Sequence, residues 1–517
     1  MRDSCAKSDE KSSMNNPLRM AEKFRAMKES IVAERTEIKA MEILQELFSY
    51  HTTSVDWNVF PEFKGLLICI LDTVGIVSLT EKHQILILNA VNKSDAKVIG
   101  VLADYYIQHI DEVHDMLAKS HVAITIAFSR RIIDFDCAGT VAILLRRFAG
   151  SKLVQAELLN NLDSNPAEIR FRIHQVTTLL MKEGDNLHNV EGLVAKLADE
   201  LGSSDVLTQI NAVEMFADGA SNKKSTAHYL LSTGIVDHLH SLFVACMDHP
   251  DSGFLYPALV KFFGHLLVTN AECMPQFPKF LDSLFDLVYH FDRLDASLRL
   301  LSFDTLAAIG STDSAKKFLN SHHSSQHDMQ RAMTAFGVAI ASGPLDLRVR
   351  HMDALSMMFA VKDQDTDENK TQGSATKRRV IFLFQKKVFN LKDTEVEQIT
   401  HKWFNWLGEP FPIIITSYMS KPFYDTRISA LRLLSIFFDY PWAIRIFSRT
   451  TGFMKCLLNR SIETNADGKQ CRFDVICKII TGGSTIISPE DMLRLKLYRR
   501  EGAFYVERQP EVDIEND

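Results

Sequence analysis

Three aspartates in the second half of the chain have the spacing of metal ligands. Asp363, Asp365 and Asp367 stand at alternate positions, as the first three ligands of a calcium loop do. Glu368 stands where the turn of that loop needs glycine, and Ser374 stands where its bidentate glutamate is required. The motif is incomplete, and we expect no calcium site here.

Two histidines and two cysteines lack the companions that a zinc or redox site needs. His323 and His327 are four residues apart, but no glutamate lies between them and no cysteine is near. Cys471 and Cys477 do not have the two-residue spacing of a zinc or redox pair. We therefore expect histidines in a solvated turn, reduced cysteines in the core, no metal and no cofactor.

The motifs of the common enzyme classes are also missing. The segment at residues 482–485, GGST, is not followed by the lysine of a phosphate-binding loop. The chain contains no GxSxG elbow, no dinucleotide-binding fingerprint and no kinase motif set. The sequence therefore predicts a protein that is not an enzyme.

The charge balance disfavours nucleic acid as a partner. The 517 residues are 46% apolar and 24% charged, and the formal net charge is -7. This composition provides no long-range positive field to attract a polyanion. The basic residues at 377–379 and 386–387 resemble a nuclear import signal or a small basic patch. A hydrophobic insertion flanked by basic residues is the simpler interpretation, and we expect no nucleic acid partner.

The sequence also disfavours a membrane location. Residues 1–16 are polar and contain no apolar targeting segment. The longest apolar stretch, Gly65 to Leu79, is interrupted by Asp72 and is too short to cross a bilayer. We expect no membrane partner and a location in the cytoplasm, with the nucleus as a second compartment.

Apolar residues recur at helical spacing from residue 17 to residue 506, and strand-like alternation is rare. A polar turn, a charged first turn and about fourteen amphipathic residues return at intervals of about 40 to 50 residues, as in HEAT and armadillo repeats. The pattern predicts an all-α, HEAT/armadillo-like α-solenoid over 17–506, with disordered tails at 1–16 and 507–517. The helical segments read from this pattern are Asn92 to Ile107, Asp134 to Phe148, Ser164 to Met181, Ser203 to Ala217, Arg293 to Ile309, Pro344 to Phe359 and Phe423 to Phe438.

Several of these segments begin with an acid followed by arginine, as in Asp295 to Arg299, Asp346 to Arg348 and Asp425 to Arg427. An acid in the first turn suits the positive end of the helix dipole. The arginine has two possible roles. It can bridge to an acid of a neighbouring repeat, which would make it part of the scaffold, or it can line a partner-binding face.

One segment interrupts the repeats. A polar run begins at Lys362, three basic residues follow at 377–379, and the apolar segment VIFLFQKKVFNL ends at Leu391. Because the helical pattern resumes at Thr394, we interpret residues 362–391 as an insertion in the solenoid.

Three blocks carry a resemblance to a known family. They are FLYPALVKFFGHLLV at 254–268, the stretch from Lys421-Pro422-Phe423 to Pro441-Trp442, and MLRLKLYRREGAFYV at 492–506. They resemble the family of the 26S proteasome non-ATPase regulatory subunit 5. A generic HEAT array does not demand the Pro-Trp pair or the Glu-Gly-x-x-Tyr-Val ending. The segment 362–391 departs from the family pattern.

The resemblance implies a chaperone that helps to assemble the base of the 26S proteasome regulatory particle. It implies binding to the C-terminal domain of ATPase regulatory subunit 7, in one module with regulatory subunit 4 and non-ATPase subunit 2, and departure before the proteasome is complete. The alternative is an armadillo-type trafficking or nuclear-transport adaptor, which uses the same kind of helical array.

Stacked helix pairs create a long face that can hold a small domain through many modest contacts. We expect the partner-binding face to be lined by Lys261, Phe263, Arg299, Arg348, Arg427, Arg432, Tyr498 and Arg499.

Overall fold

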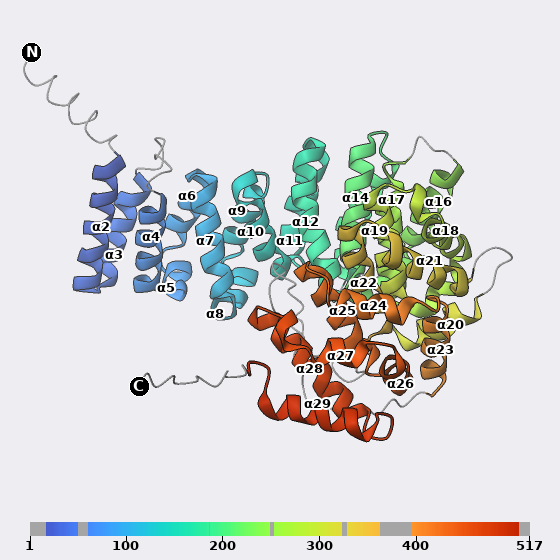
Figure 1. Cartoon of the computed structure of the whole chain (residues 1–517). Coiled ribbons are helices and arrows are strands. Elements are labelled where there is room, and N and C mark those ends of the chain that lie inside the picture. The colour runs from blue at the N-terminus through green and yellow to red at the C-terminus, as the bar shows by residue number, and fades with distance from the viewer. Residues whose placement is uncertain are drawn as a thin grey trace, which may run out of the picture. The chain divides into compact units, whose positions relative to one another are not determined.

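The computed structural model describes residues 17–49, 60–185, 187–248, 253–322, 328–361 and 394–505. These residues form helices joined by turns, and no β-strand occurs among them. The chain divides into two units, residues 1–239 and 240–517, and Figure 1 shows the helices in order along the chain. The predicted all-α solenoid is confirmed. The predicted tails at 1–16 and 507–517 and the predicted insertion at 362–391 lie outside the described residues.

The first unit consists of short helices in succession. They are α2 (Pro17–Glu34), α3 (Glu37–Ser49), α4 (Phe60–Val74), α5 (Ile76–Glu81), α6 (Gln84–Lys93), α7 (Ala96–Gln108), α8 (Ile110–Asp115), η3 (Met116–Ser120), α9 (Val122–Arg131), α10 (Phe135–Leu145), η4 (Arg146–Phe148), α11 (Lys152–Ser164), α12 (Ala167–Glu183), η5 (Leu187–Val190), α13 (Glu191–Asp199), η6 (Glu200–Gly202), α14 (Val206–Ala220) and α15 (Lys224–Ser232).

Helix α16 (Ile235–Asp248) begins in the first unit and ends in the second. The second unit continues with α17 (Tyr256–Thr269), η8 (Ala271–Gln276), α18 (Pro278–Tyr289), η9 (Phe291–Arg293), α19 (Ala296–Ile309), α20 (Asp313–Ser321), α21 (Met329–Ser342), α22 (Leu345–Phe359), α23 (Thr394–Asn405), α24 (Phe411–Tyr418), α25 (Tyr424–Phe437), α26 (Pro441–Arg449), α27 (Phe453–Leu458), η10 (Arg460–Ile462), α28 (Ala466–Gly482) and α29 (Pro489–Glu501).

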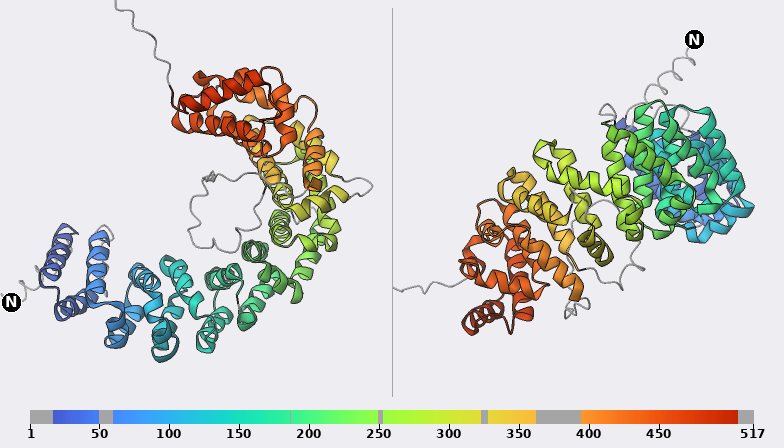
Figure 2. Two further views of the ribbon diagram at one scale, coloured as in Figure 1. Left: turned by 90° about the horizontal axis from the view of Figure 1, so that it is seen from below. Right: turned by 90° about the vertical axis from the view of Figure 1, so that its right-hand side faces the viewer.

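Each unit is built from two rows of helices (Figure 2). In the first unit α7, α10, α12 and α14 pack side by side, and α6, α9, α11 and α13 form the row against them. In the second unit α17, α19, α22, α25 and α28 form one row, which we call the main row, and α18, α21, α24 and α27 form the other. Helices two or three steps apart in sequence are thus neighbours in space, which is the arrangement of a solenoid.

The polar turns predicted from the sequence begin the helices of these rows. Asp95, Asp205 and Asp295 accept hydrogen bonds of 2.8 to 3.3 Å from first-turn N–H groups of α7, α14 and α19. Those N–H groups have no partner within the helix, so the carboxylates satisfy them. All seven predicted segments are helices, namely α7, α10, α12, α14, α19, α22 and α25.

An arginine joins each of four helices to the turn before it. The fourth residue of α12, α19, α22 and α25 is arginine, and its guanidinium donates to the carbonyl oxygen five residues earlier. We call this contact the arginine tie. The pairs are Arg170 with Asn165, Arg299 with Leu294, Arg348 with Gly343 and Arg427 with Pro422. The tie supplies a partner for a turn carbonyl and orients the helix relative to the turn.

The second unit buries aromatic side chains between its two rows. Phe263 of α17 contacts Phe243, Phe277 and Phe280 with ring centroids 5.3 to 5.7 Å apart. A side chain at Gly264 would place its Cβ 2.7 Å from Thr305 of α19. Close packing therefore explains Phe263 and Gly264 in the KFFG sequence of this helix.

The C-terminal end of the main row contains a buried charge cluster. Arg427 and Arg472 both bind Glu463, with N to O distances of 3.2 and 3.0 Å, and all three side chains are buried. Arg472 also donates to the carbonyl oxygens of Met419 and Cys456. Burying charges costs desolvation energy, which is offset only when the groups are paired and hydrogen-bonded. The cluster links α25, α28 and the turn before α28.

Buried His351 of α22 makes no hydrogen bond through either ring nitrogen to any described residue. Its ring packs against Phe303, with centroids 4.4 Å apart. Burial, with the nearby charge of Arg299, lowers the pKa of His351 to about 4. The folded unit therefore holds this histidine neutral at pH values where an unfolded chain would protonate it.

No single helix among the described residues has the length and apolar character to cross a membrane. The helices Lys224–Ser232 and Ile235–Met247 pass the length and composition criteria only as a pair, and they are bent by 79°.

We predict that Glu463→Gln destabilises the second unit by roughly 3–5 kcal/mol, because it leaves two buried guanidinium groups without a counter-charge. Glu501 is a matched control, since it also binds an arginine (Arg460, 3.1 Å) but is about a quarter exposed. Glu501→Gln should cost about 1 kcal/mol or less. Urea unfolding followed by circular dichroism measures both changes, and equal costs would contradict this account of the cluster.

We predict that stability falls as the pH is lowered from about 6.5 to about 4, in part because of His351. In this range the unfolded chain takes up a proton that the buried imidazole does not. His351→Leu should reduce the fall in melting temperature over this interval, whereas His228→Leu, at an exposed position of α15, should not. Melting curves at pH 7, 5.5 and 4.5 test this, and parallel curves for wild type and His351→Leu would refute it.

Candidate partner-binding surface

Three of the eight expected contact residues lie in the core. Phe263 is fully buried among other phenylalanines. Tyr498 is buried beneath Arg460, whose guanidinium carbon is 3.5 Å from the centroid of the tyrosine ring. Arg427 is buried against Glu463. The expectation that these side chains line an exposed face is wrong, because packing within and between repeats already uses them.

Arg299 and Arg348 are half-buried and belong to the arginine ties. The guanidinium of Arg299 also stacks on Phe291, and Arg348 also donates to the hydroxyl of Tyr418 at 3.2 Å. The scaffold role considered from the sequence fits this geometry better than a partner-binding role. The acids at the helix starts are not the partners seen here, however. Arg427 pairs with Glu463, and Asp295 caps its own helix.

The other three expected residues reach the surface. Arg432 is exposed in the middle of α25, between helical turns that are otherwise buried. Lys261 is half-buried on α17, and Arg499 is exposed on α29. Arg432 and Lys261 lie on helices of the main row, whereas Arg499 lies on the last described helix.

Arg432 is one of several charged residues that lie on successive helices of the main row. Arg350 of α22 binds Asp304 of α19 at 3.1 Å, and Lys478 of α28 binds Asp439, just beyond α25, at 2.6 Å. Between them Asp353 of α22 accepts a hydrogen bond of 3.2 Å from Ser429 of α25. We call six solvent-accessible charges beyond the first turns of these four helices the charged row, and they are Asp304, Arg350, Asp353, Arg432, Asp474 and Lys478.

The acids of the charged row are partly desolvated by the residues packed around them. Desolvation raises the pKa of Asp304, Asp353 and Asp474, and the nearby cations oppose this only in part. A further hydrogen-bond donor or cation that approaches such a carboxylate stabilises its charged form. The row therefore offers alternating acids and bases that a partner with the complementary pattern can pair.

Apolar contact area lies beside these charges. The exposed residues in the interior of α22 are Arg350, Asp353 and Met357, which recur at helical spacing on one side. Met357 is 37% exposed, and methionine adapts its shape to a bound surface. Asp304, Arg350, Asp353 and Met357 were not predicted from the sequence. A charged residue flanked by apolar positions, as in Ala430 to Leu434, is a signal that could have indicated the three charged residues.

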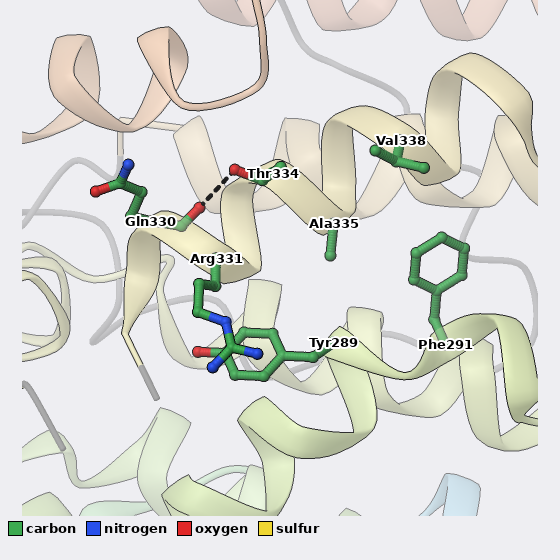
Figure 3. Close-up of a pocket in the computed structure, with 7 residues that line it drawn as sticks. All are labelled: Tyr289, Phe291, Gln330, Arg331, Thr334, Ala335 and Val338. Carbon is green, nitrogen blue, oxygen red and sulfur yellow. Dashed lines mark hydrogen bonds between the residues drawn. The ribbon is translucent and has the colours of Figure 1, made fainter. Parts of the chain in front are cut away.

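A separate pocket of about 420 Å³ lies between the end of α18 and α21 (Figure 3). The guanidinium carbon of Arg331 lies 4.3 Å from the centroid of the Tyr289 ring, and Phe291 and Val338 complete an apolar wall. The hydroxyl of Thr334 donates to the carbonyl of Gln330 at 2.9 Å, as the dashed line shows. The side chains that line this pocket provide no nucleophile with an adjacent base.

Metal chemistry finds no support in the described part of the chain. None of its histidines, cysteines, aspartates and glutamates form a group of three or more that could hold an ion. The calcium-like acids at 363–367 and the pair His323 and His327 lie outside the described residues. Burial raises the pKa of the thiols of Cys471 and Cys477, which disfavours the reactive thiolate.

Similar proteins include proteasome subunits. The 26S proteasome non-ATPase regulatory subunit 5 of Homo sapiens is 24% identical over 366 residues, covering 68% of this chain and 66% of that protein. The protein of the same name from Mus musculus is 25% identical over 359 residues, covering 68% of this chain and 64% of that protein. The matches thus span slightly less than two thirds of these relatives.

A solved structure of an engineered protein aligns with 81% of this chain and 98% of its own, at 12% identity and a TM-score of 0.41. That similarity is too weak to add to the argument. The family model described as proteasome non-ATPase 26S subunit matches residues 6–374 and 379–517. Since this match covers most of the 517 residues of this chain, the chain belongs to the proteasome non-ATPase 26S subunit family.

Proposed function

We propose that this protein is a chaperone for assembly of the base of the 26S proteasome regulatory particle. It binds the C-terminal domain of ATPase regulatory subunit 7, in a module with regulatory subunit 4 and non-ATPase subunit 2, and it dissociates before the proteasome is complete. Membership of the family, together with the relatives named as a non-ATPase regulatory subunit, supports this role.

The charged row is the surface that we assign to the ATPase domain. It combines fixed, alternating charges with the exposed side chain of Met357, on helices whose opposite sides are packed in the core. Complementary charges give an interface its register and speed association, whereas apolar area gives it affinity. Release then requires no bond chemistry, because a later partner that competes for the same domain shifts the equilibrium.

The proposal includes no catalysis and no cofactor. The names of the relatives describe a non-ATPase subunit, and the side chains that line the pocket beside Tyr289 provide no nucleophile with an adjacent base. A chaperone for this particle would work in the cytoplasm and the nucleus, and this location is part of the proposal.

We predict that Arg432→Glu weakens binding to the isolated C-terminal domain of ATPase regulatory subunit 7 by about tenfold or more at low salt, because it reverses the central base of the row. Arg445→Glu is the matched control, since Arg445 is exposed on α26 outside the row. Both variants should melt like the wild type, because exposed charges contribute little to stability. Calorimetric titration of the full chain measures the affinities.

Equal affinity for wild type and Arg432→Glu would remove the charged row from the interface. Absence of binding to any proteasomal ATPase, with specific binding of coat proteins or import cargo instead, would replace the chaperone proposal by a trafficking or nuclear-transport adaptor.

We predict the opposite outcome for an arginine tie. Arg348→Ala should lower stability by about 1–3 kcal/mol, because it removes two hydrogen bonds and leaves the Gly343 carbonyl without its donor. Binding of the ATPase domain, measured well below the melting temperature, should remain close to that of wild type. An unchanged melt with lost binding would return Arg348 to the partner-binding face.

A further inference from the structure

The last described helix, α29, has an outer side that differs from that of a usual terminal repeat. Met492, Leu495 and Tyr498 are buried and pack this helix against α27 and α28. Leu493 and Leu497, one turn apart, are 70% and 44% exposed. Terminal repeats of solenoids normally carry a polar outer side, because nothing stacks on them. The leucine pair therefore leaves apolar area that no described residue covers.

Cations lie beside the two leucines. At about 100° per residue, Leu493, Lys496, Leu497 and Arg500 fall within an arc of about 100° on one side of α29. Lys496 and Arg500 are exposed, and neither forms an ion pair with a described residue. Arg494, further round the helix, is already paired with Asp491 at 3.3 Å. The side therefore combines two leucines with two available positive charges. We call these four residues the α29 face.

Arg460 holds this helix in place. Its guanidinium donates to the carbonyl oxygens of Tyr498 and Gly502 at 3.0 and 2.8 Å, and it binds Glu501 at 3.1 Å. It also stacks over the ring of Tyr498. The C-terminal end of α29 is thus fixed by backbone and side-chain contacts. A face fixed in advance loses little conformational entropy when it binds.

We propose that the α29 face is a docking site for an acidic helical segment of a partner protein. Two apolar side chains of the segment, one turn apart, cover Leu493 and Leu497, and its carboxylates pair with Lys496 and Arg500. This inference is independent of the charged row and of the ATPase domain assigned to it.

The occupant is a protein segment for two reasons. Two leucines offer too little apolar area to hold a protein on a bilayer, and the chain as a whole carries a net charge of -7, which is repelled by anionic lipid. An acidic helix fits, because leucines at i and i+4 with flanking glutamates present the complementary pattern at the same spacing.

The test uses the full chain and a fluorescein-labelled synthetic helix whose one side carries two leucines one turn apart, flanked by glutamates. Fluorescence anisotropy should show saturable binding of this peptide and none of its counterpart with lysines in place of the glutamates. The double variants Leu493→Ser with Leu497→Ser, and Lys496→Glu with Arg500→Glu, should each weaken binding by about tenfold or more. Arg445→Glu should not, and melting curves should show that all variants are folded.

Three results would overturn the proposal. Absence of saturable binding, or equal affinity of the double variants, would show that the α29 face is not the site. Binding that emerges only after residues 507–517 are deleted would identify the acidic end of the chain itself as the occupant. Binding of vesicles of anionic phospholipid that needs Leu493 and Leu497, without binding of the peptide, would identify a membrane surface instead. The peptide titration does not depend on the titration with the ATPase domain. Either proposal can therefore be refuted while the other stands.

Discussion

The arginine tie is the contact on which the regular stacking of this protein depends. A HEAT-like repeat must reverse direction in a short turn, and the carbonyl groups of that turn lie outside the hydrogen-bond ladder of the helix that follows. In α12, α19, α22 and α25 the fourth residue supplies a guanidinium to one of these carbonyls. Arginine suits this role because its planar fork reaches back over the first turn while keeping donors for a second acceptor. At Arg170 and Arg427 that second acceptor is a glutamate, Glu200 or Glu463.

The ties distinguish two kinds of arginine on α22 and α25. Those at the start of row helices are engaged by the turn, and their substitution acts on the fold. Those in the middle of α22 and α25, Arg350 and Arg432, are exposed among the described residues. They lie among the carboxylates of Asp304 and Asp353, whose pKa is raised by desolvation and which pair with donors on neighbouring helices. Arginine thus belongs to the scaffold at the start of these helices and to the exposed surface in their middle.

A solenoid suits a protein that must hold another protein for a limited time. Its rows present charges at the regular spacing of the helices, so an interface can be assembled from several modest contacts instead of one deep pocket. The buried cluster around Glu463 and the clamp of Arg460 stiffen the C-terminal repeats. Binding to them then costs little conformational entropy, and each surface can be occupied or vacated without rearranging the core.

The sequence by itself determined the all-α class, the solenoid and the position of its main helices. Helical periodicity and aspartate-containing turns are local properties, and they are read from neighbouring residues alone. It also supplied the family resemblance. It did not determine which side of each helix faces solvent. Phe263, Arg427 and Tyr498 carry side chains typical of interfaces, yet neighbouring repeats bury them. Only the tertiary structure decides this, because a side chain is buried or exposed according to the helix that packs against it. For the same reason the pairing of Asp304 with Arg350, 46 residues apart in sequence, becomes visible only when α19 and α22 lie side by side.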